Sequence, residues 1–123
     1  MWPDIERAYV TILREAVGVR TATDIPGDVE TIPTGFIRVA RGPGSDDGIT
    51  DQPLLDVEAF HPDRHGAERL AEQARQAILN SPNQIGVLVD AATTASTPTR
   101  VFYSPNVERY VASYRLRLRR PRA

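Results

Sequence analysis

The chain contains no cysteine, no lysine and no long apolar run. The lack of cysteine excludes disulfides, thiolate metal sites and cysteine nucleophiles. All fifteen basic residues are arginine, which excludes a Walker-type phosphate loop and Schiff-base chemistry. No apolar run approaches the roughly 20 residues that span a bilayer, and the first residues, MWPDIERAYV, lack the basic-then-apolar layout of a signal peptide. We therefore expect cytosolic synthesis and no association with a membrane.

Length and composition predict one soluble globular domain that covers residues 1–123. The net charge of −1 hides an asymmetry: residues 100–123 hold seven arginines and one acid, whereas the rest of the chain holds eight arginines and fifteen acids. This split fits either a nucleic-acid-binding tail or a basic strand paired with acidic neighbours in one sheet. The strand pattern favours the second, because Tyr110 and Tyr114 fall on the apolar side of the strand rather than among the arginines.

Two segments have the periodicity of amphipathic helices. The first covers residues 3–17, with Pro3 at its first position and Gly18 placed to end it. The second covers residues 63–79, directly after an alternating strand. Its apolar stripe is rich in alanine, which lets a helix backbone lie close against a sheet; the stripe consists of Ala67, Leu70, Ala71, Ala74, Ala77 and Ile78.

The remaining apolar patterns predict strands near 19–23, 35–41, 54–60, 85–92 and 107–120. The continuous apolar run at 85–92 indicates a central strand, and a Thr/Ser/Pro connection follows it. These elements predict an α+β fold, with a mixed or antiparallel sheet of about four to five strands and two helices packed on one face. The opposite face would carry charges of both signs, and we expect it to contact a neighbouring subunit or partner through Arg38, Asp56, Glu58, Arg115, Arg117 and Arg119.

The run GPGSDDGITDQP, residues 42–53, predicts a polar loop of twelve residues. Its residues match neither the ligand positions of an EF-hand nor a G-x-G-x-x-G phosphate loop. An acidic loop that becomes ordered on contact with a partner is the better interpretation, and that contact would involve Ser45, Asp46, Asp47 and Asp51.

His61, Asp63 and His65 are the one candidate metal cluster. Pro62 and the predicted helix start place His61 before the helix, and no further ligand set is evident, so the better interpretation is that Asp63 caps the helix. The chain also lacks a G-x-S-x-G elbow, and its two histidines lie too close together to serve a dispersed triad. The sequence therefore predicts no catalytic residue, no metal, no cofactor and no enzymatic activity.

Two blocks resemble a known family. TDQPLLDVEAFHPDRHGAERLAEQARQAIL (residues 50–79) resembles the central block of tail terminator proteins of long-tailed phages, in the style of phages of GC-rich actinobacterial hosts. SPNVERYVASYRLRLRRP (residues 104–121) is similar to the closing strand of that family, where an aromatic residue precedes an alternating basic stretch. The order of the predicted elements extends the resemblance over the whole chain.

This resemblance implies a virion structural protein, made in the host cytoplasm, that forms a hexameric ring on the head-proximal end of the tail tube. The ring would stop tube polymerisation and present a docking surface to the head–tail connector or stopper protein. DNA would pass through its central hole without being read. A neck or tail-completion protein remains an alternative, because such proteins share similar small folds; a monomeric protein-binding module is a more distant one.

A DNA conduit should not be strongly basic, since phosphate attraction would retard passage. We therefore predict that Arg115, Arg117 and Arg119 do not line the lumen. They would instead meet acidic groups, either within the sheet, where Asp56 and Glu58 are the nearest candidates, or on the adjacent subunit.

Overall fold

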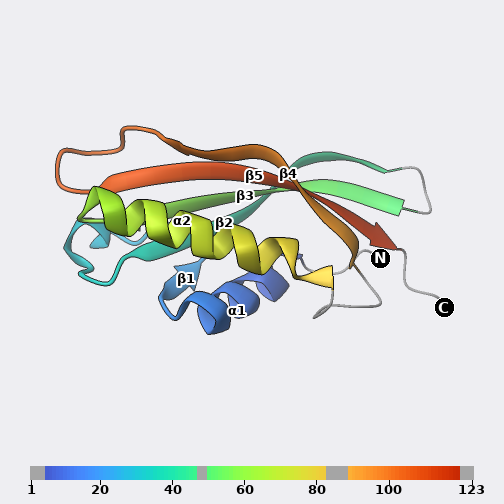
Figure 1. The fold of residues 1–123 in the computed structure, drawn as a ribbon, viewed down its shortest axis with the longest axis horizontal. Coiled ribbons are helices and arrows are strands. Elements are labelled where there is room, and N and C mark those ends of the chain that lie inside the picture. The colour runs from blue at the N-terminus through green and yellow to red at the C-terminus, as the bar shows by residue number, and fades with distance from the viewer. Residues whose placement is uncertain (1–4, 47–49, 83–88, 120–123) are drawn as a thin grey trace.

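The computed structural model describes residues 5–46, 50–82 and 89–119, with side chains except at 43–46, 50, 51 and 119. The described elements form a five-stranded sheet in the order β1-β2-β3-β5-β4, together with two α-helices (Figure 1). The elements in chain order are α1 (Ile5–Val17), β1 (Arg20–Ala22), the short 3-10 helix η1 (Val29–Thr31), β2 (Phe36–Asp46), β3 (Thr50–His61), α2 (Arg64–Leu79), β4 (Val89–Arg100) and β5 (Glu108–Arg119).

The sheet is mixed: β1 pairs in parallel with β2, and the other neighbouring strands pair antiparallel. Both helices pack on one side of it, because the main buried cluster joins residues of α1 and α2 to β2, β3 and β5. This confirms the predicted α+β fold with two helices on one face. Neither described helix is long and apolar enough to cross a membrane.

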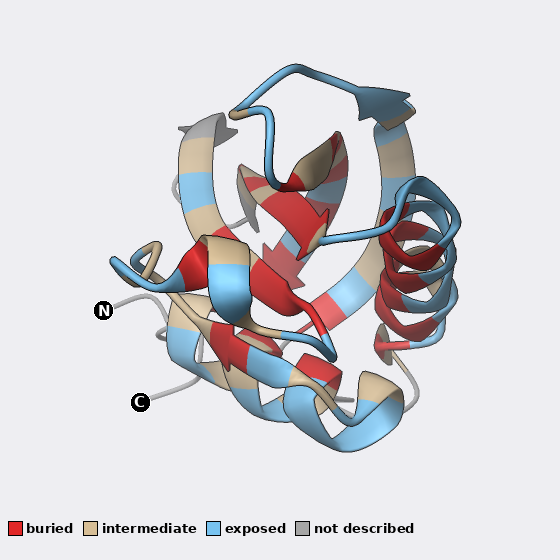
Figure 2. Ribbon diagram, turned by 90° about the vertical axis from the view of Figure 1, so that its left-hand side faces the viewer, coloured by how far each residue is buried: buried red, intermediate tan, exposed pale blue. Residues whose placement is uncertain are grey.

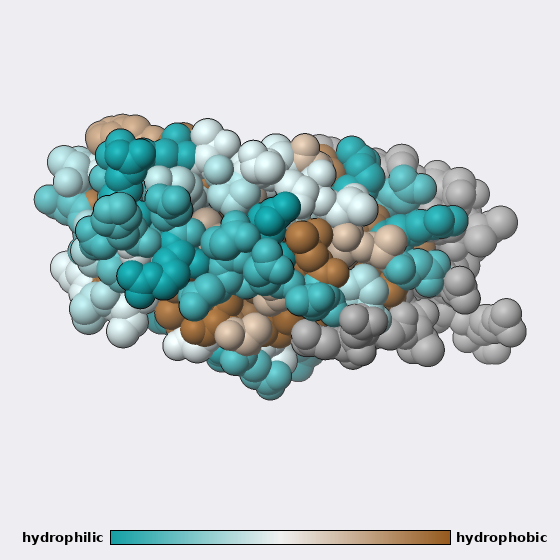
Figure 3. Space-filling view, in the orientation of Figure 1, coloured by the Kyte–Doolittle hydropathy of each residue, from teal (hydrophilic) through white to brown (hydrophobic). Residues whose placement is uncertain are grey.

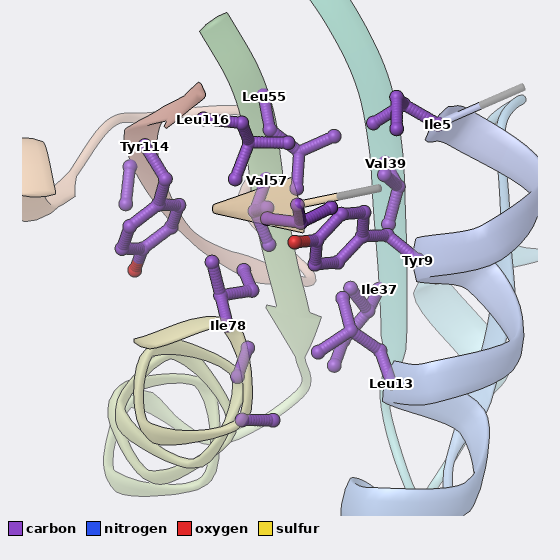
Figure 4. Close-up of a cluster of buried hydrophobic side chains, with 14 of the residues drawn as sticks. Ile5, Tyr9, Leu13, Ile37, Val39, Leu55, Val57, Ile78, Tyr114 and Leu116 are labelled. Carbon is purple, nitrogen blue, oxygen red and sulfur yellow. The ribbon is translucent and has the colours of Figure 1, made fainter. Parts of the chain in front are cut away.

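The core between helices and sheet follows the predicted stripes. Tyr9 and Leu13 of α1 lie against Ile37 and Val39 of β2, and Ile78 of α2 lies near Tyr114 of β5 (Figure 4). All six residues of the predicted α2 stripe are buried. The hydroxyl of Tyr9 donates to Ser81 Oγ at 2.5 Å, since the single Ser81 proton is committed to the carbonyl of Ile78 at 2.6 Å. This chain of hydrogen bonds connects α1 to the end of α2.

The prediction of a twelve-residue loop at 42–53 was wrong. β2 continues to Asp46 and β3 begins at Thr50, with residues 45 and 46 opposite 52 and 51. The Gly- and Pro-rich stretch is accommodated by a register shift between Gly42 and Ser45. The added strand length is held by β5, whose last residues pair with Thr50 and Asp51. A neighbouring strand can thus keep a backbone extended where side-chain propensity alone predicts a loop.

The strand predicted at 85–92 is confirmed over residues 89–92, but its predicted central position and the predicted connection after it were wrong. Residues 85–88 lie outside the described part, and the strand that follows, β4, lies at the edge of the sheet rather than in its centre. The predicted Thr/Ser/Pro connection is itself part of β4. Threonine favours strands, and an edge strand tolerates Pro98 because one side of its backbone has no ladder to break. Three register shifts between β4 and β5 accompany this irregular composition.

A second, smaller core lies on the sheet face opposite the helices. It consists of Phe36 and Phe60 from neighbouring strands, Val29 from the segment after β1, and Val107 at the start of the β5 hairpin. The two phenyl rings lie 6.2 Å apart, centroid to centroid. One end of this face is therefore covered by the segments 24–32 and 101–107, and only the rest is open (Figure 2).

Candidate interaction surface

A charge cluster on the open face is centred on Glu58 of β3. Its Oε2 accepts from Nη1 of Arg38 at 2.9 Å, and its Oε1 accepts from Nη1 of Arg109 at 3.1 Å. The Glu58 side chain is only 12% exposed, and those of Arg38 and Arg109 are 33% and 19% exposed. Two cations therefore share one largely buried carboxylate. Glu58 does meet a C-terminal arginine within the sheet, as expected, but that arginine is Arg109.

Asp56 makes a different contact on the same face. Its Oδ1 accepts from the hydroxyl of Ser113 at 2.8 Å, directly across the β3–β5 pair. Its other oxygen leans over Gly42, where an added Cβ would lie 2.8 Å from Oδ2. Asp56 thus has a hydrogen-bond partner within the sheet, but among the described residues it has no ion pair with Arg115 or Arg117.

Arg115 and Arg117 are exposed, and neither forms an ion pair with any described residue. Their neighbours across the strands are uncharged: Leu54 and Thr93 flank Arg115, and Ala91 lies opposite Arg117. The third predicted residue, Arg119, ends β5, and its side chain lies outside the described part. We call Arg115, Arg117 and these three neighbours the arginine patch. Arg115 and Arg117 thus meet no acid among the described side chains of their own sheet, and the alternative, that they meet acids on the adjacent subunit, stays a prediction.

The turn between β4 and β5 presents the most exposed large apolar side chain of the described chain. Phe102 is 78% exposed, and Val101 and Tyr103 beside it are 39% and 38% exposed. The sequence patterns did not predict this exposed surface; its only signal in the sequence is the isolated triplet Val-Phe-Tyr at residues 101–103. In Figure 3 a hydrophobic patch lies over this turn, at the upper left of the molecule.

The same turn is held firmly in place. Arg109 donates to the carbonyls of Val101 and Phe102 at 3.4 and 3.2 Å, and its guanidinium lies 5.3 Å from the centre of the Tyr103 ring. That ring packs edge-on against Phe60, with centroids 5.1 Å apart. The hydroxyl of Ser104 donates to Oε2 of Glu30 at 2.8 Å, which attaches the turn to the segment after β1.

An exposed ion pair closes the base of this hairpin. Arg100 donates to both oxygens of Glu108, at 2.9 and 2.8 Å. These hydrogen bonds lower the pKa of the Glu108 carboxyl and raise the pKa of the Arg100 guanidinium. Bidentate geometry of this kind orients the strand ends, although exposed pairs contribute little to stability.

The candidate metal cluster has a structural role. Asp63 is the N-cap of α2, with Oδ2 accepting from the amide of Gly66 at 3.1 Å, and its own amide donates to Nδ1 of His61 at 2.9 Å. The His61 ring lies against Gly66 so closely that an added Cβ would be 2.3 Å from it. Within the described ranges no group of three potential ligands is arranged to hold a metal ion. The interpretation of Asp63 as a helix cap is confirmed.

The predicted partner-contacting loop has a different form. Ser45 and Asp46 are residues of β2, and Asp51 is a residue of β3, so they lie on a hairpin arm rather than in a loop. Asp47 lies outside the described residues. The structure does not bring this arm together with the Glu58 cluster, because the two occupy opposite ends of the β2–β3 pair.

Comparisons with known proteins agree with this architecture. A family model described as phage tail termination protein matches residues 1–98. This match includes the block at 50–79 and ends before the block at 104–121. Among solved structures, the fold is similar to a chain in the "Virion of native gene transfer agent (GTA) particle", with a TM-score of 0.66, 11% identity and 94% of each chain covered. At that identity the likeness is one of fold. Comparison with curated proteins gives no match.

Proposed function

The chain belongs to the phage tail termination protein family, and we propose that it caps the head-proximal end of a tail tube as a ring. Members of this family are structural proteins of the tail, so the chain has a structural role in completing the tail of a virion. The match of the family model over residues 1–98 is the observation that carries the proposal. Beyond this structural role, we propose three specific activities: hexamer formation, arrest of tube growth and docking of the head–tail connector.

The distribution of contacts on the two sheet faces supports a ring subunit. One face is fully used by α1 and α2, so it contributes the core of the subunit. On the other face, two exposed arginines have no counter-charge among the residues that the structure describes. An arginine presents a planar, bidentate donor that suits a carboxylate on a neighbouring protein. We therefore assign Arg115 and Arg117 to the interface between subunits, with Arg119 as the next residue of the same ladder.

The remaining predicted interface residues have a supporting role in this proposal. Glu58 holds Arg38 and Arg109 within one subunit, and Asp56 holds Ser113, so these side chains stiffen the sheet beneath the interface. With the arginines placed between subunits, the lumen would stay free of strong positive charge and DNA would pass without sequence-specific binding.

The direct test uses tubes polymerised from the tail tube protein of the same phage. Added chain should stop tube growth, so that tubes stay short, and electron microscopy should show a six-fold ring at one end only. Tubes that grow to the same length with and without the chain would contradict the proposal. A ring that binds the connector but never the tube would favour the alternative of a neck protein.

Arg117→Glu tests the interface assignment within the same assay. It should abolish rings, because a carboxylate would replace the cation that faces the neighbour's acid. Arg69→Glu is the matched control, since Arg69 is also exposed but lies on α2, away from the open sheet face. Normal rings from Arg117→Glu, or equal loss from Arg69→Glu, would contradict the assignment.

The hairpin arm is proposed to contact the tube or the connector. Deleting residues 45–48 should leave a folded, ring-forming protein that no longer caps tubes, because the arm lies beyond the paired residues of the Glu58 cluster. Circular dichroism and sedimentation check folding and assembly separately. Unchanged capping would count against a role for Ser45, Asp46 and Asp47, and Asp51→Asn would then test the opposite strand of the arm.

A further inference from the structure

We propose that the ring closes through a head-to-tail contact in which Phe102 of one copy inserts between Arg115 and Arg117 of the next copy. The inference rests on the proposed ring and adds the two surfaces that build it. We call the donating surface the aromatic end; it consists of the turn 101–107 and the adjoining segment 24–32. The receiving surface is the arginine patch.

Phe102 has the features of an interface anchor. It is 78% exposed, while the backbone on both sides of it is fixed by Arg109, which donates to the carbonyls of Val101 and Phe102. The amide of Val101 also donates to the carbonyl of Arg109 at 2.9 Å. Because the turn is already ordered, docking would cost little conformational entropy. Exposed rings on rigid supports are typical of the few residues that dominate binding energy.

The arginine patch has a spacing that fits an aromatic ring. Arg115 and Arg117 are two residues apart on one strand face, so their stems are separated by about 7 Å. That distance is about twice the van der Waals contact of ~3.5 Å, so one ring fits between the two side chains. Guanidinium groups stack favourably on aromatic faces. The small neighbours Ala91 and Thr93 leave room above the strand.

Charge favours the same pairing. At the aromatic end, Glu30 accepts a hydrogen bond from Ser104, and Asp24 is exposed; neither forms an ion pair with a described residue. The other acids around this end are neutralised within the chain, as with Asp28 by Arg20 and Glu108 by Arg100. Two acids that form no ion pair with a described residue thus lie on one surface, and two arginines of which the same is true lie on the other.

The two surfaces lie far apart on one subunit, so the contact must be between copies. The β4–β5 turn is at the left end of Figure 1, whereas β5 carries the arginine patch towards its right end. The nine residue-to-residue steps of strand from Glu108 to Arg117 correspond to about 30 Å. A contact between different surfaces of identical subunits is heterologous, and it closes into a ring when the rotation per subunit allows.

The chain lacks cysteine, so engineered disulfides can map this contact without background. Val101→Cys and Thr93→Cys in one chain flank the proposed contact without removing it. Oxidation on tail tubes should give a covalent ladder up to the full ring on non-reducing gels. The control pair Val101→Cys with Glu68→Cys, on the exposed side of α2, should give none. A ladder of equal strength from the control, or none from the first pair, would overturn the inference.

Substitution of the anchor provides the second measurement. Phe102→Ala should reduce ring yield at least about tenfold while leaving the melting temperature unchanged, because the side chain has few contacts within its own subunit. Val101→Ala is the matched control and should assemble normally. Arg115→Glu combined with Arg117→Glu should fail alone and recover when Asp24→Arg and Glu30→Arg are present on the same chain, since both contacts then regain opposite charges.

The outcomes separate this inference from the proposed function. If wild-type chain forms rings on tubes and Phe102→Ala forms them equally well, the role of Phe102 as an interface anchor is refuted and the capping function still stands. Phe102→Ala rings that form but do not bind tubes would place Phe102 at the tube contact, which also overturns the inference. A wild-type chain that neither assembles nor caps tubes would refute both.

Discussion

Glu58 is the residue whose removal should affect stability most directly. Glu58→Ala leaves two arginines, Arg38 and Arg109, that lose their shared counter-charge in a site where the carboxylate was 12% exposed. Removing one partner of a fully buried pair costs about 3–5 kcal/mol. Both arginines retain backbone acceptors here, because Arg38 also donates to the carbonyl of Thr23 at 3.0 Å and Arg109 donates to the 101–102 carbonyls.

We therefore expect Glu58→Ala to lower the free energy of unfolding by about 2–3 kcal/mol. For a domain of this size that corresponds to a fall in melting temperature of roughly 8–12 °C. Glu58→Gln, which keeps the size and one acceptor, should cost about half as much. Urea denaturation at pH 7, followed by circular dichroism, measures both values.

Asp56→Asn is the matched control, because Asp56 lies on the same strand face but makes one hydrogen bond to an uncharged partner. It should cost less than about 1 kcal/mol. Double-mutant cycles with Arg38→Ala and Arg109→Ala should give coupling to Glu58 in both cases. A loss below about 0.5 kcal/mol for Glu58→Ala, or an equal loss for Asp56→Asn, would refute the reasoning.

Two further predictions concern the buried tyrosines. The Tyr114 hydroxyl is buried and has no hydrogen-bond partner in the described part of the chain, so Tyr114→Phe should be neutral or stabilising by up to about 1 kcal/mol in urea denaturation. Tyr9→Phe, which breaks the bond to Ser81, should destabilise by about as much, and the opposite order would contradict both assignments. Burial raises the pKa of Tyr9 and of Tyr114 to about 12. Because the ordinary value of 10.0 applies in the unfolded chain, the contribution of these two tyrosines to the free energy of unfolding should be constant below pH 10 and should be lost as pH rises from 10 to about 12. A free energy of unfolding that does not fall between pH 10 and about 12 would contradict this prediction.

The sequence by itself determined the helices, three of the strands and the division of the sheet into two faces. Apolar residues recur at helical spacing along α2 and at every second position along β5, in each case over more than ten residues. Only a helix in the first segment and a strand in the second can bury these residues on one face. The cap at Asp63 is equally local, since it needs only a carboxylate three residues before an unpaired amide. The resemblance to the tail terminator family, carried first by residues 50–79, is likewise a property of the sequence alone.

Only the tertiary structure decided the edges of the sheet and the partners of its charges. Residues 42–46 and 93–99 have loop-like composition, yet each is extended because a neighbouring strand supplies the hydrogen-bond ladder. The strand alternation placed Glu58 and five arginines on one face, but the register across β2, β3 and β5 selects which of them meet. It places Glu58 between Arg38 and Arg109 and leaves Arg115 and Arg117 unpaired within the described chain. Pairing across strands depends on contacts between distant segments, and no local pattern encodes it.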